Sequence, residues 1–361
     1  MSEAAPCSAR GAALADYDFD LPDAQIAQHA VEPRDAARLL VAWRSREGLA
    51  HHVVADLPDL LPRRTLLVVN DTRVVPARLL GHKRDSGGAV ELLLVAPFSA
   101  AGDDGLRGQR AIARSSKPLR VGQVLEFGDG VHATLRANHG DGSVDVDLEG
   151  AADLEQLLAR VGHLPLPPYL RGGREDADGR DRTRYQTAWA AHPGSIAAPT
   201  AGLHFTPDLL QRLDDVGVER RAVTLHVGPG TFLPVRVEQI AAHRVLAERF
   251  EVSEATAEAL RAARRDERPI VAVGTTTTRV LETLGRDGIV AGRGETGMTL
   301  LPGHRFEVVR GLMTNFHLPR SSLLLLLAAF AGREPVLDAY RHAVASGYRF
   351  YSYGDASLWL P

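Results

Sequence analysis

The sequence is poor in cysteine, with Cys7 the only one among 361 residues. One thiol excludes an intramolecular disulfide framework and a zinc site built on cysteines, and it fits a reducing cytoplasm. Long hydrophobic runs are also lacking, because the longest, residues 323–331, falls well short of the roughly 20 residues of a membrane-spanning helix. Residues 1–15 have no apolar centre of a signal peptide and are predicted to form a disordered tail. We therefore expect a cytoplasmic protein that does not bind membranes.

The chain has no excess of positive charge. Its 42 Lys and Arg face 45 Asp and Glu, for a net charge of −3, which argues against a generally basic, nucleic-acid-binding surface. Any contact with RNA must then be a local patch. One candidate is residues 171–184, with five Arg against four acids, and the alternative is a solvated loop whose charges nearly cancel.

The length predicts two domains. Between residues 73 and 154, short apolar runs alternate with turn signals, among them the hairpin-type cluster at 138–142, and no long helical period occurs. This segment is predicted to be a small all-β barrel. Residues 16–72 and 155–361 alternate strands with helices. They predict an α/β main domain, an open, mixed sheet with helices, interrupted by the inserted barrel.

Several apolar stretches of the main domain are predicted to be strands that run into polar residues: 66–69, 223–227, 269–273, 306–313 and 348–358. Alternation within 223–227 points His226 away from the apolar face. Open α/β sheets bind ligands at the carboxyl ends of their strands. The polar residues expected around one crevice at that edge are Asn70, His226, Thr275, His317 and Asp355.

Helix signals follow some of these strands. Thr206 and Pro207 are typical of a helix start, and Leu209, Leu213 and Val216 are predicted to share one face of the helix. Residues 274–279, GTTTTR, turn into another helix, and Ser321 and Ser322 cap a Leu-rich one.

Two histidine loops, residues 198–205 (APTAGLHF) and 224–232 (TLHVGPGTF), indicate the chemistry. Small residues let backbone approach a ligand, and imidazole suits proton transfer near neutral pH. GTTTTR at a helix N-terminus suits a phosphate or a ribose. The histidine spacing does not support a metal, and the G-x-S-x-G elbow of hydrolases is missing. The residues therefore favour general acid–base chemistry on a nucleoside-like ligand.

Structural alternatives remain for three of these residues. His226 can be an ordinary hydrogen-bonded histidine, Asn70 can cap a turn, and Arg279 can be an ion-pair partner on a helix surface.

Eight motifs together resemble those of the S-adenosylmethionine:tRNA ribosyltransferase-isomerase family of the queuosine pathway. They occur in order over nearly the whole chain, at residues 70–79, 164–170, 184–187, 198–205, 224–232, 274–279, 314–319 and 348–355. The resemblance implies an α/β domain interrupted by a β-barrel. It also implies transfer and rearrangement of the ribosyl part of S-adenosylmethionine onto the aminomethyl group of a 7-deazaguanine (preQ1) at the tRNA wobble position. Epoxyqueuosine forms, and adenine and methionine are released.

The resemblance makes S-adenosylmethionine the ribosyl donor co-substrate, without a metal, and preQ1-containing tRNA the partner of a chain that we expect to be a monomer. A catalytic base at C5′ would be His204 or His226, and the group on the adenine side would be His317 or Asp355, with Glu248 completing the catalytic set. The residues expected around S-adenosylmethionine are Thr200, Gly202, Phe205, Gly228, Gly230, Thr231, Gly274, Thr275, Thr276, Thr277, Arg279, Asn315 and Tyr353. Those expected to bind tRNA are Asn70, Arg73, Arg171, Arg184 and Tyr185.

The chain departs from the family pattern at two positions. Leu246 stands where the family usually has a histidine, and Arg310 stands where it tends to have an aspartate. Two other functions stay open at this point: a paralogue that uses S-adenosylmethionine or another nucleoside on a small molecule, and a non-catalytic relative that binds tRNA.

Overall fold

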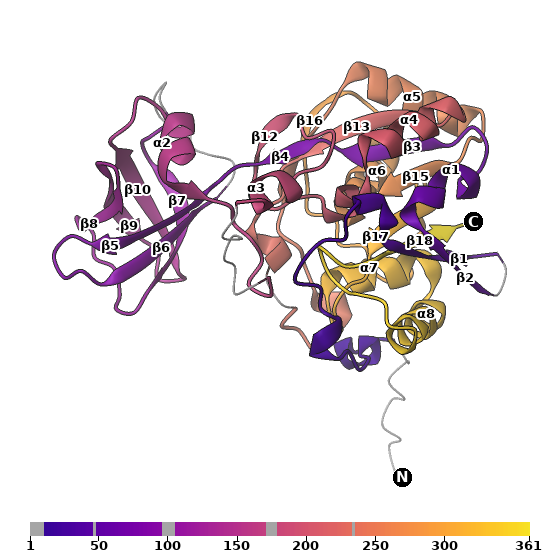
Figure 1. Cartoon of the computed structure of the whole chain (residues 1–361), viewed down its shortest axis with the longest axis horizontal. Coiled ribbons are helices and arrows are strands. Elements are labelled where there is room, and N and C mark those ends of the chain that lie inside the picture. Colours follow the sequence, from indigo (N-terminus) through magenta and orange to yellow (C-terminus); the bar gives the residue numbers. More distant parts are fainter. Residues whose placement is uncertain (1–10, 46–47, 96–104, 171–178, 233–234) are drawn as a thin grey trace, which may run out of the picture. The chain divides into compact units, whose positions relative to one another are not determined.

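The computed structural model describes residues 11–45, 48–95, 105–170, 179–232 and 235–361. The chain forms two compact units (Figure 1). The large unit comprises Met1–Asp71, Pro199–Leu225 and Leu233–Pro361, and the small unit comprises Thr72–Ala198 and His226–Phe232. The domain boundaries predicted at 73 and 154 stay a prediction. Residues 1–10 of the predicted tail lie outside the described residues, whereas the backbone N–H groups of Gly11 and Ala13 donate to the Asp16 carboxylate.

The large unit is built on a mixed sheet of nine strands. Four parallel strands form its centre: β13 (Glu219–Leu225), β3 (Leu66–Asn70), β15 (Ile270–Val273) and β17 (Gly311–Asn315). On one side, β18 (Ala356–Leu360) runs antiparallel to β17 and is followed by β1 (Arg38–Trp43) and β2 (Leu49–Val53); on the other side lie β14 (Glu248–Val252) and β16 (Gly292–Thr296). Every residue of β3, β15 and β17 is buried, as expected for central strands of a sheet covered on both faces.

The helices of the large unit lie on both sides of this sheet. In Figure 1, α4 (Pro207–Asp215) and α5 (Glu254–Arg265) lie above the central strands, and α7 (Ser322–Ala331) and α8 (Arg333–Ala345) lie below them. α6 (Thr275–Asp287) packs on β13, β3 and β15, and the short α1 (Leu57–Leu60) packs on α4.

The predicted caps are confirmed. The Thr206 and Ser321 hydroxyls accept hydrogen bonds from the backbone N–H groups of Leu209 and Leu324. The predicted shared face is wrong for Val216: Leu209 and Leu213 are buried in α4, but the helix ends at Asp215 and Val216 is 56% exposed.

The small unit contains a closed antiparallel barrel, which confirms the predicted fold class. Its strands follow the order β5 (Arg78–Lys83), β6 (Ala89–Leu94), β7 (Gln109–Ser115), β10 (Ser143–Glu149), β9 (Val131–Asn138) and β8 (Val124–Gly128). Pairing of β8 with β5 closes the barrel, and a Cβ at Gly81 would lie 2.0 Å from the Glu126 carbonyl oxygen at this closure. Only glycine permits that approach of two backbones. The remaining elements are β4 (Thr72–Val74), α2 (Leu154–Val161), β11 (Gly162–His163), α3 (Asp181–Arg184) and β12 (His192–Ser195).

Two predicted strands are displaced along the chain. The strand predicted at 306–313 begins at Gly311, and the strand predicted at 348–358 begins at Ala356, after Asp355. The apolar side chains that suggested earlier starts are buried without joining the sheet. Phe350, for example, packs against Phe316 and Tyr340 with ring centroids 5.0 and 6.0 Å apart.

A buried carboxylate accounts for the first displacement. Glu282, on α6, is 2% exposed and accepts hydrogen bonds from the backbone N–H groups of Glu307, Val308 and Val309 at 2.9–3.0 Å. Those groups would otherwise pair with a strand. The carboxylate therefore replaces the sheet as the hydrogen-bond partner of residues 307–309.

Glu282→Gln is expected to lower the free energy of unfolding by about 2 kcal/mol, because an amide nitrogen would face backbone N–H groups and leave buried donors unpaired. Urea denaturation measures the loss. Glu295→Gln is the control, since Glu295 is 60% exposed in its pair with Arg249, and such pairs contribute under about 1 kcal/mol. Equal midpoints for the two variants would contradict this account of residues 307–309.

Candidate functional site

Polar residues gather at one edge of the large unit's sheet. The parallel strands β13, β3, β15 and β17 all end there, at Leu225, Asn70, Val273 and Asn315. β18 runs the opposite way and pairs Ala356 with Asn315, which brings Asp355 to this edge from the start of a strand. Asn70, Thr275, His317 and Asp355 therefore end or adjoin strands at the predicted edge, and this is where α/β sheets bind ligands. His226 belongs to the small unit, so its place in the predicted crevice stays a prediction.

His204 is held in a network around Asn315. It ends a 3-10 helix (Thr200–His204) that packs on β17, and it is 4% exposed. The Asn315 amide nitrogen lies 3.0 Å from His204 Nε2 and 3.2 Å from the Tyr351 carbonyl oxygen. The Thr200 hydroxyl donates to the Asn315 amide oxygen at 3.0 Å. Burial, with Arg349 and Arg34 nearby, lowers the pKa of His204 to about 4.

His317 is held from the other face of the sheet. The Nε2 atom of His317 lies 3.0 Å from the Thr314 hydroxyl. His204 instead forms its hydrogen bond with the side chain of Asn315. Thr314 and Asn315 are consecutive strand residues, so their side chains point to opposite faces. Burial lowers the pKa of His317 to about 3, and its imidazole is neutral at physiological pH.

Asp355 fastens the loop that precedes β18. Its two carboxylate oxygens accept from the backbone N–H groups of Arg38 at 3.0 Å and Arg349 at 2.8 Å. Burial raises the pKa of this carboxyl group, against the opposing effect of those hydrogen bonds and the two arginine charges. The carboxylate is committed to backbone, which suits a residue that positions the 349–355 loop.

The first turn of α6 forms another part of the edge. Gly274, with φ of 89°, precedes Thr275, and the N–H groups of a first helical turn have no partner within the helix. The Thr277 hydroxyl donates to the Val273 carbonyl. Asn70 holds this turn to β13, because its amide pairs with both backbone groups of Leu225 and lies 3.4 Å from the Thr276 hydroxyl.

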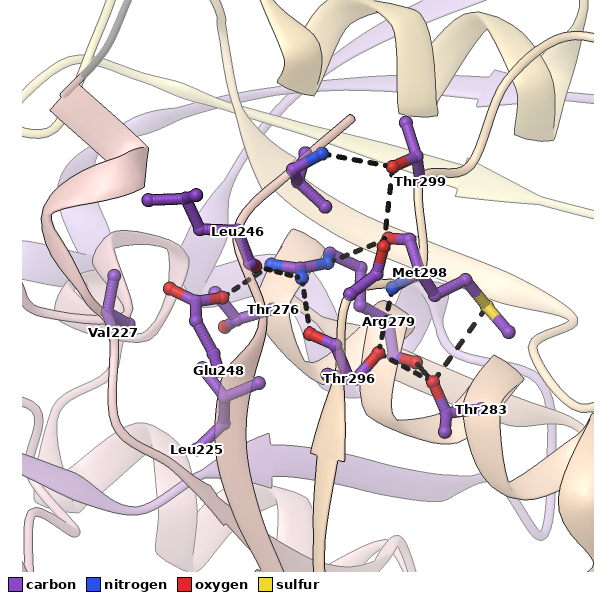
Figure 2. Close-up of polar contacts among 12 residues, drawn as sticks. Leu225, Val227, Leu246, Glu248, Thr276, Arg279, Thr283, Thr296, Met298 and Thr299 are labelled. Carbon is purple, nitrogen blue, oxygen red and sulfur yellow. Dashed lines mark hydrogen bonds and ion pairs between the residues drawn. The ribbon is translucent and has the colours of Figure 1, made fainter. Parts of the chain in front are cut away.

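Arg279 is buried beside Glu248 (Figure 2). Its Nη1 donates to the Glu248 carboxylate at 2.5 Å, while Nε donates to the Met298 carbonyl at 3.1 Å and Nη2 to the Thr296 carbonyl at 2.9 Å. Arg279 is 8% exposed and Glu248 is 7% exposed. The surface ion pair considered from the sequence is thus a buried one, which joins α6 to β14 and β16.

The departures from the family pattern lie on the surface. Leu246 is 55% exposed, and its carbonyl accepts from Arg279 at 3.4 Å. Arg310 is exposed just before β17. Burial of Arg44 lowers the pKa of that residue, and the nearby charge of Arg310 lowers it further.

From His226 on, the second histidine loop lies in the small unit. His226 is half-buried, with Nδ1 2.8 Å from the Thr72 hydroxyl. A Cβ at Gly194 would lie 2.9 Å from the ring, so glycine makes room for the imidazole. After it come Gly228 and a 3-10 helix (Pro229–Phe232), which contains Gly230 and Thr231.

The remaining predicted residues have different exposures. Among those assigned to tRNA, Arg73 is exposed, Arg184 is half-buried, Tyr185 is 1% exposed, and Arg171 lies outside the described residues. Phe205 and Tyr353, assigned to S-adenosylmethionine, are 1% and 3% exposed.

Sequence reasoning missed Tyr351. Its φ of 74° is unusual for a bulky residue, and its carbonyl is bound by the Asn315 amide. No sequence signal marks a tyrosine with positive φ, because glycine and asparagine are the usual occupants of that region.

Within the described ranges, no group of three or more His, Cys, Asp or Glu residues is placed to hold a metal ion. In that same part of the chain, no helix has the length and apolar content needed to span a membrane.

Comparison with known proteins shows extensive similarity. A family model described as queuosine biosynthesis protein matches residues 14–359. The S-adenosylmethionine:tRNA ribosyltransferase-isomerase of Anaeromyxobacter dehalogenans is 56% identical over 351 residues, which cover 96% of this chain and 99% of the relative. The enzyme of that name from Gloeobacter violaceus is 48% identical over 361 residues, covering 99% and 98%. A crystal structure of S-adenosylmethionine tRNA ribosyltransferase from Thermotoga maritima matches with a TM-score of 0.54 and 33% identity, covering 95% of this chain and 99% of that one.

Proposed function

The chain belongs to the queuosine biosynthesis protein family, and from that premise we propose that it is an S-adenosylmethionine:tRNA ribosyltransferase-isomerase. It transfers the ribosyl part of S-adenosylmethionine to the aminomethyl group of preQ1 at the tRNA wobble position and rearranges it to epoxyqueuosine. Adenine and methionine leave. The observation that carries the proposal is the family match over residues 14–359. The polar edge of the large unit's sheet, where α/β folds bind ligands, supports it.

The proposed chemistry needs a base and a group that assists the departure of adenine. The sulfonium acidifies the neighbouring C5′–H, and His204 or His226 removes that proton. His317 assists adenine by a hydrogen bond from its ring N–H, because its low pKa keeps the imidazole neutral and it cannot act as an imidazolium acid. Asp355 acts as a positioning residue, since both of its oxygens already accept backbone hydrogen bonds.

The donor substrate is held by small and hydroxyl-bearing residues of the predicted loops. The first turn of α6 offers N–H groups to ribose or to the methionine carboxylate. The residues proposed to surround S-adenosylmethionine are Thr200, Gly202, Phe205, Gly228, Gly230, Thr231, Gly274, Thr275, Thr276, Thr277, Asn315 and Tyr353. Arg279 and Glu248 position α6 and β14 through their ion pair, without touching substrate.

Contacts to tRNA are proposed for arginines that bind phosphates, Arg73, Arg171 and Arg184. Asn70 and Tyr185 are left out, because the Asn70 amide holds Leu225 and Tyr185 is 1% exposed.

The test incubates the protein with S-adenosylmethionine and an anticodon stem-loop that contains preQ1. We expect adenine release and the mass of epoxyqueuosine in the RNA. Turnover with the free base but not with RNA would favour the small-molecule paralogue. Binding of the stem-loop without consumption of S-adenosylmethionine would favour the non-catalytic relative.

A further inference from the structure

The orientation of the Asn315 amide is fixed by its surroundings. The Tyr351 carbonyl oxygen only accepts hydrogen bonds, so the Asn315 atom 3.2 Å from it must be the amide nitrogen. The Thr200 hydroxyl donates to the amide oxygen on the other side. The atom that faces His204 Nε2 at 3.0 Å is therefore a donor.

The Asn315 amide donor that faces Nε2 determines the tautomer of His204. Nε2 must present its lone pair to the amide, so the proton of the neutral ring sits on Nδ1. Protonation of Nε2 would set two donors against each other inside the protein. Burial and the charges of Arg349 and Arg34 oppose the imidazolium as well, in agreement with a pKa of about 4.

The Nδ1–H group is a donor in need of a partner. The residues that the structure describes give it no hydrogen-bond partner, and Nδ1 is not one of their fully buried polar atoms that lack one. Nδ1 therefore reaches solvent within a side chain that is only 4% exposed, and water or a ligand can accept its hydrogen bond there.

We infer that Asn315 is a positioning residue which locks His204 as the neutral Nδ1–H tautomer, so that His204 donates a hydrogen bond to an acceptor atom of the substrate and does not remove its proton. The part of this inference that concerns substrate rests on the proposed function. In S-adenosylmethionine the acceptors are adenine ring nitrogens, ribose oxygens and the carboxylate. Of the two candidate bases, His226 then remains.

Asn315 also holds the loop at Tyr351, in addition to setting the tautomer of His204. Tyr351 has a φ of 74°, and its carbonyl is held by Asn315 and by the Gly354 N–H, while its own N–H donates to the Phe316 carbonyl. Such strained residues persist only where their surroundings hold them, and they concentrate at functional sites. Loss of Asn315 therefore removes a contact that holds the loop as well as the contact that sets the tautomer.

The tautomer is measured directly by nitrogen NMR of protein labelled with ¹⁵N-histidine, with the His204 signals assigned by difference from His204→Gln. We expect Nδ1 protonated and Nε2 unprotonated from pH 8 to pH 5. Asn315→Asp places an acceptor at Nε2 and is expected to move the proton there, to raise the pH at which the ring titrates and to lower kcat about 10²–10³-fold, the usual loss for one positioned donor.

Thr200→Val is the matched control. It removes the hydrogen bond to the Asn315 oxygen, while Tyr351 still orients the amide, so the tautomer should stay on Nδ1. Protonated Nε2 in the unmodified protein, or an unchanged tautomer in Asn315→Asp, would overturn the inference. If Asn315→Asp fails to fold, the unmodified protein and Thr200→Val still decide it. Lack of adenine release by the unmodified protein would overturn the proposed function and leave the tautomer result standing.

Discussion

Arg279→Met is expected to lower the free energy of unfolding by about 3–5 kcal/mol, because it removes the guanidinium that offsets the buried negative charge of Glu248. The Glu248 carboxylate is 6% exposed at its side chain, so water cannot replace the guanidinium. The carbonyls of Thr296 and Met298 lose their donor at the same time (Figure 2). Urea denaturation with a common slope measures the difference.

Arg286→Met is the matched control on the same helix. Arg286 pairs with its neighbour Asp287, and their side chains are 64% and 53% exposed. An exposed pair of this kind contributes under about 1 kcal/mol. A loss for Arg279→Met that is no larger than the loss for Arg286→Met would contradict the structural role of the buried pair.

The double variant Glu248→Leu/Arg279→Met separates the charge from the geometry. It removes the buried carboxylate together with the guanidinium and is expected to recover part of the stability lost in Arg279→Met. The difference in free energy of unfolding that remains between the double variant and the unmodified protein measures the carbonyl hydrogen bonds that hold residues 296–298. If the double variant is no more stable than Arg279→Met, the lost carbonyl hydrogen bonds account for the destabilisation, and the buried Glu248 charge does not.

The parts of the fold that the sequence predicts are those decided by local pattern. The strand at Leu66–Asn70 is apolar up to its last residue because helices cover both faces of the sheet, and the cap at Thr206 uses atoms three residues apart. The strands of the barrel are likewise predictable, because short apolar runs and turn residues alternate along that segment of the sequence.

The parts that it misses depend on partners distant in the chain. Residues 307–309 have the composition of a strand, but the Glu282 carboxylate, 25 residues away, takes the N–H group of Glu307. Arg279 has the motif of a ligand-binding helix start, yet Glu248, 31 residues away, binds its guanidinium. Asp355 reaches the predicted edge although its strand was misplaced, because β18 runs antiparallel and begins where β17 ends.

His226→Gln is expected to lower the rate of adenine release by about 10²–10⁴-fold, the usual contribution of a positioned general base. If the Thr72 hydroxyl, 2.8 Å away, accepts from Nδ1–H, Nε2 is the unprotonated nitrogen that a base requires. His204→Asn is the comparison, because asparagine can donate near the position of Nδ1 and cannot act as a base. His204→Asn is expected to lower the rate of adenine release by less than about tenfold. Single-turnover assays with saturating S-adenosylmethionine separate this chemical step from binding.

Gly194→Ala tests the same assignment without changing the histidine. A Cβ at residue 194 would lie 2.9–3.1 Å from three atoms of the His226 ring, and φ there is +144°, so the imidazole or the backbone must move. A displaced base acts poorly, since a shift of about 1 Å can cost 10²-fold. A loss in both Gly194→Ala and His226→Gln, with His204→Asn still active, would make His226 the base. A loss in His204→Asn, with Gly194→Ala and His226→Gln still active, would make His204 the base. In that case the Asn315 amide would have to release Nε2 before that nitrogen could accept the substrate proton.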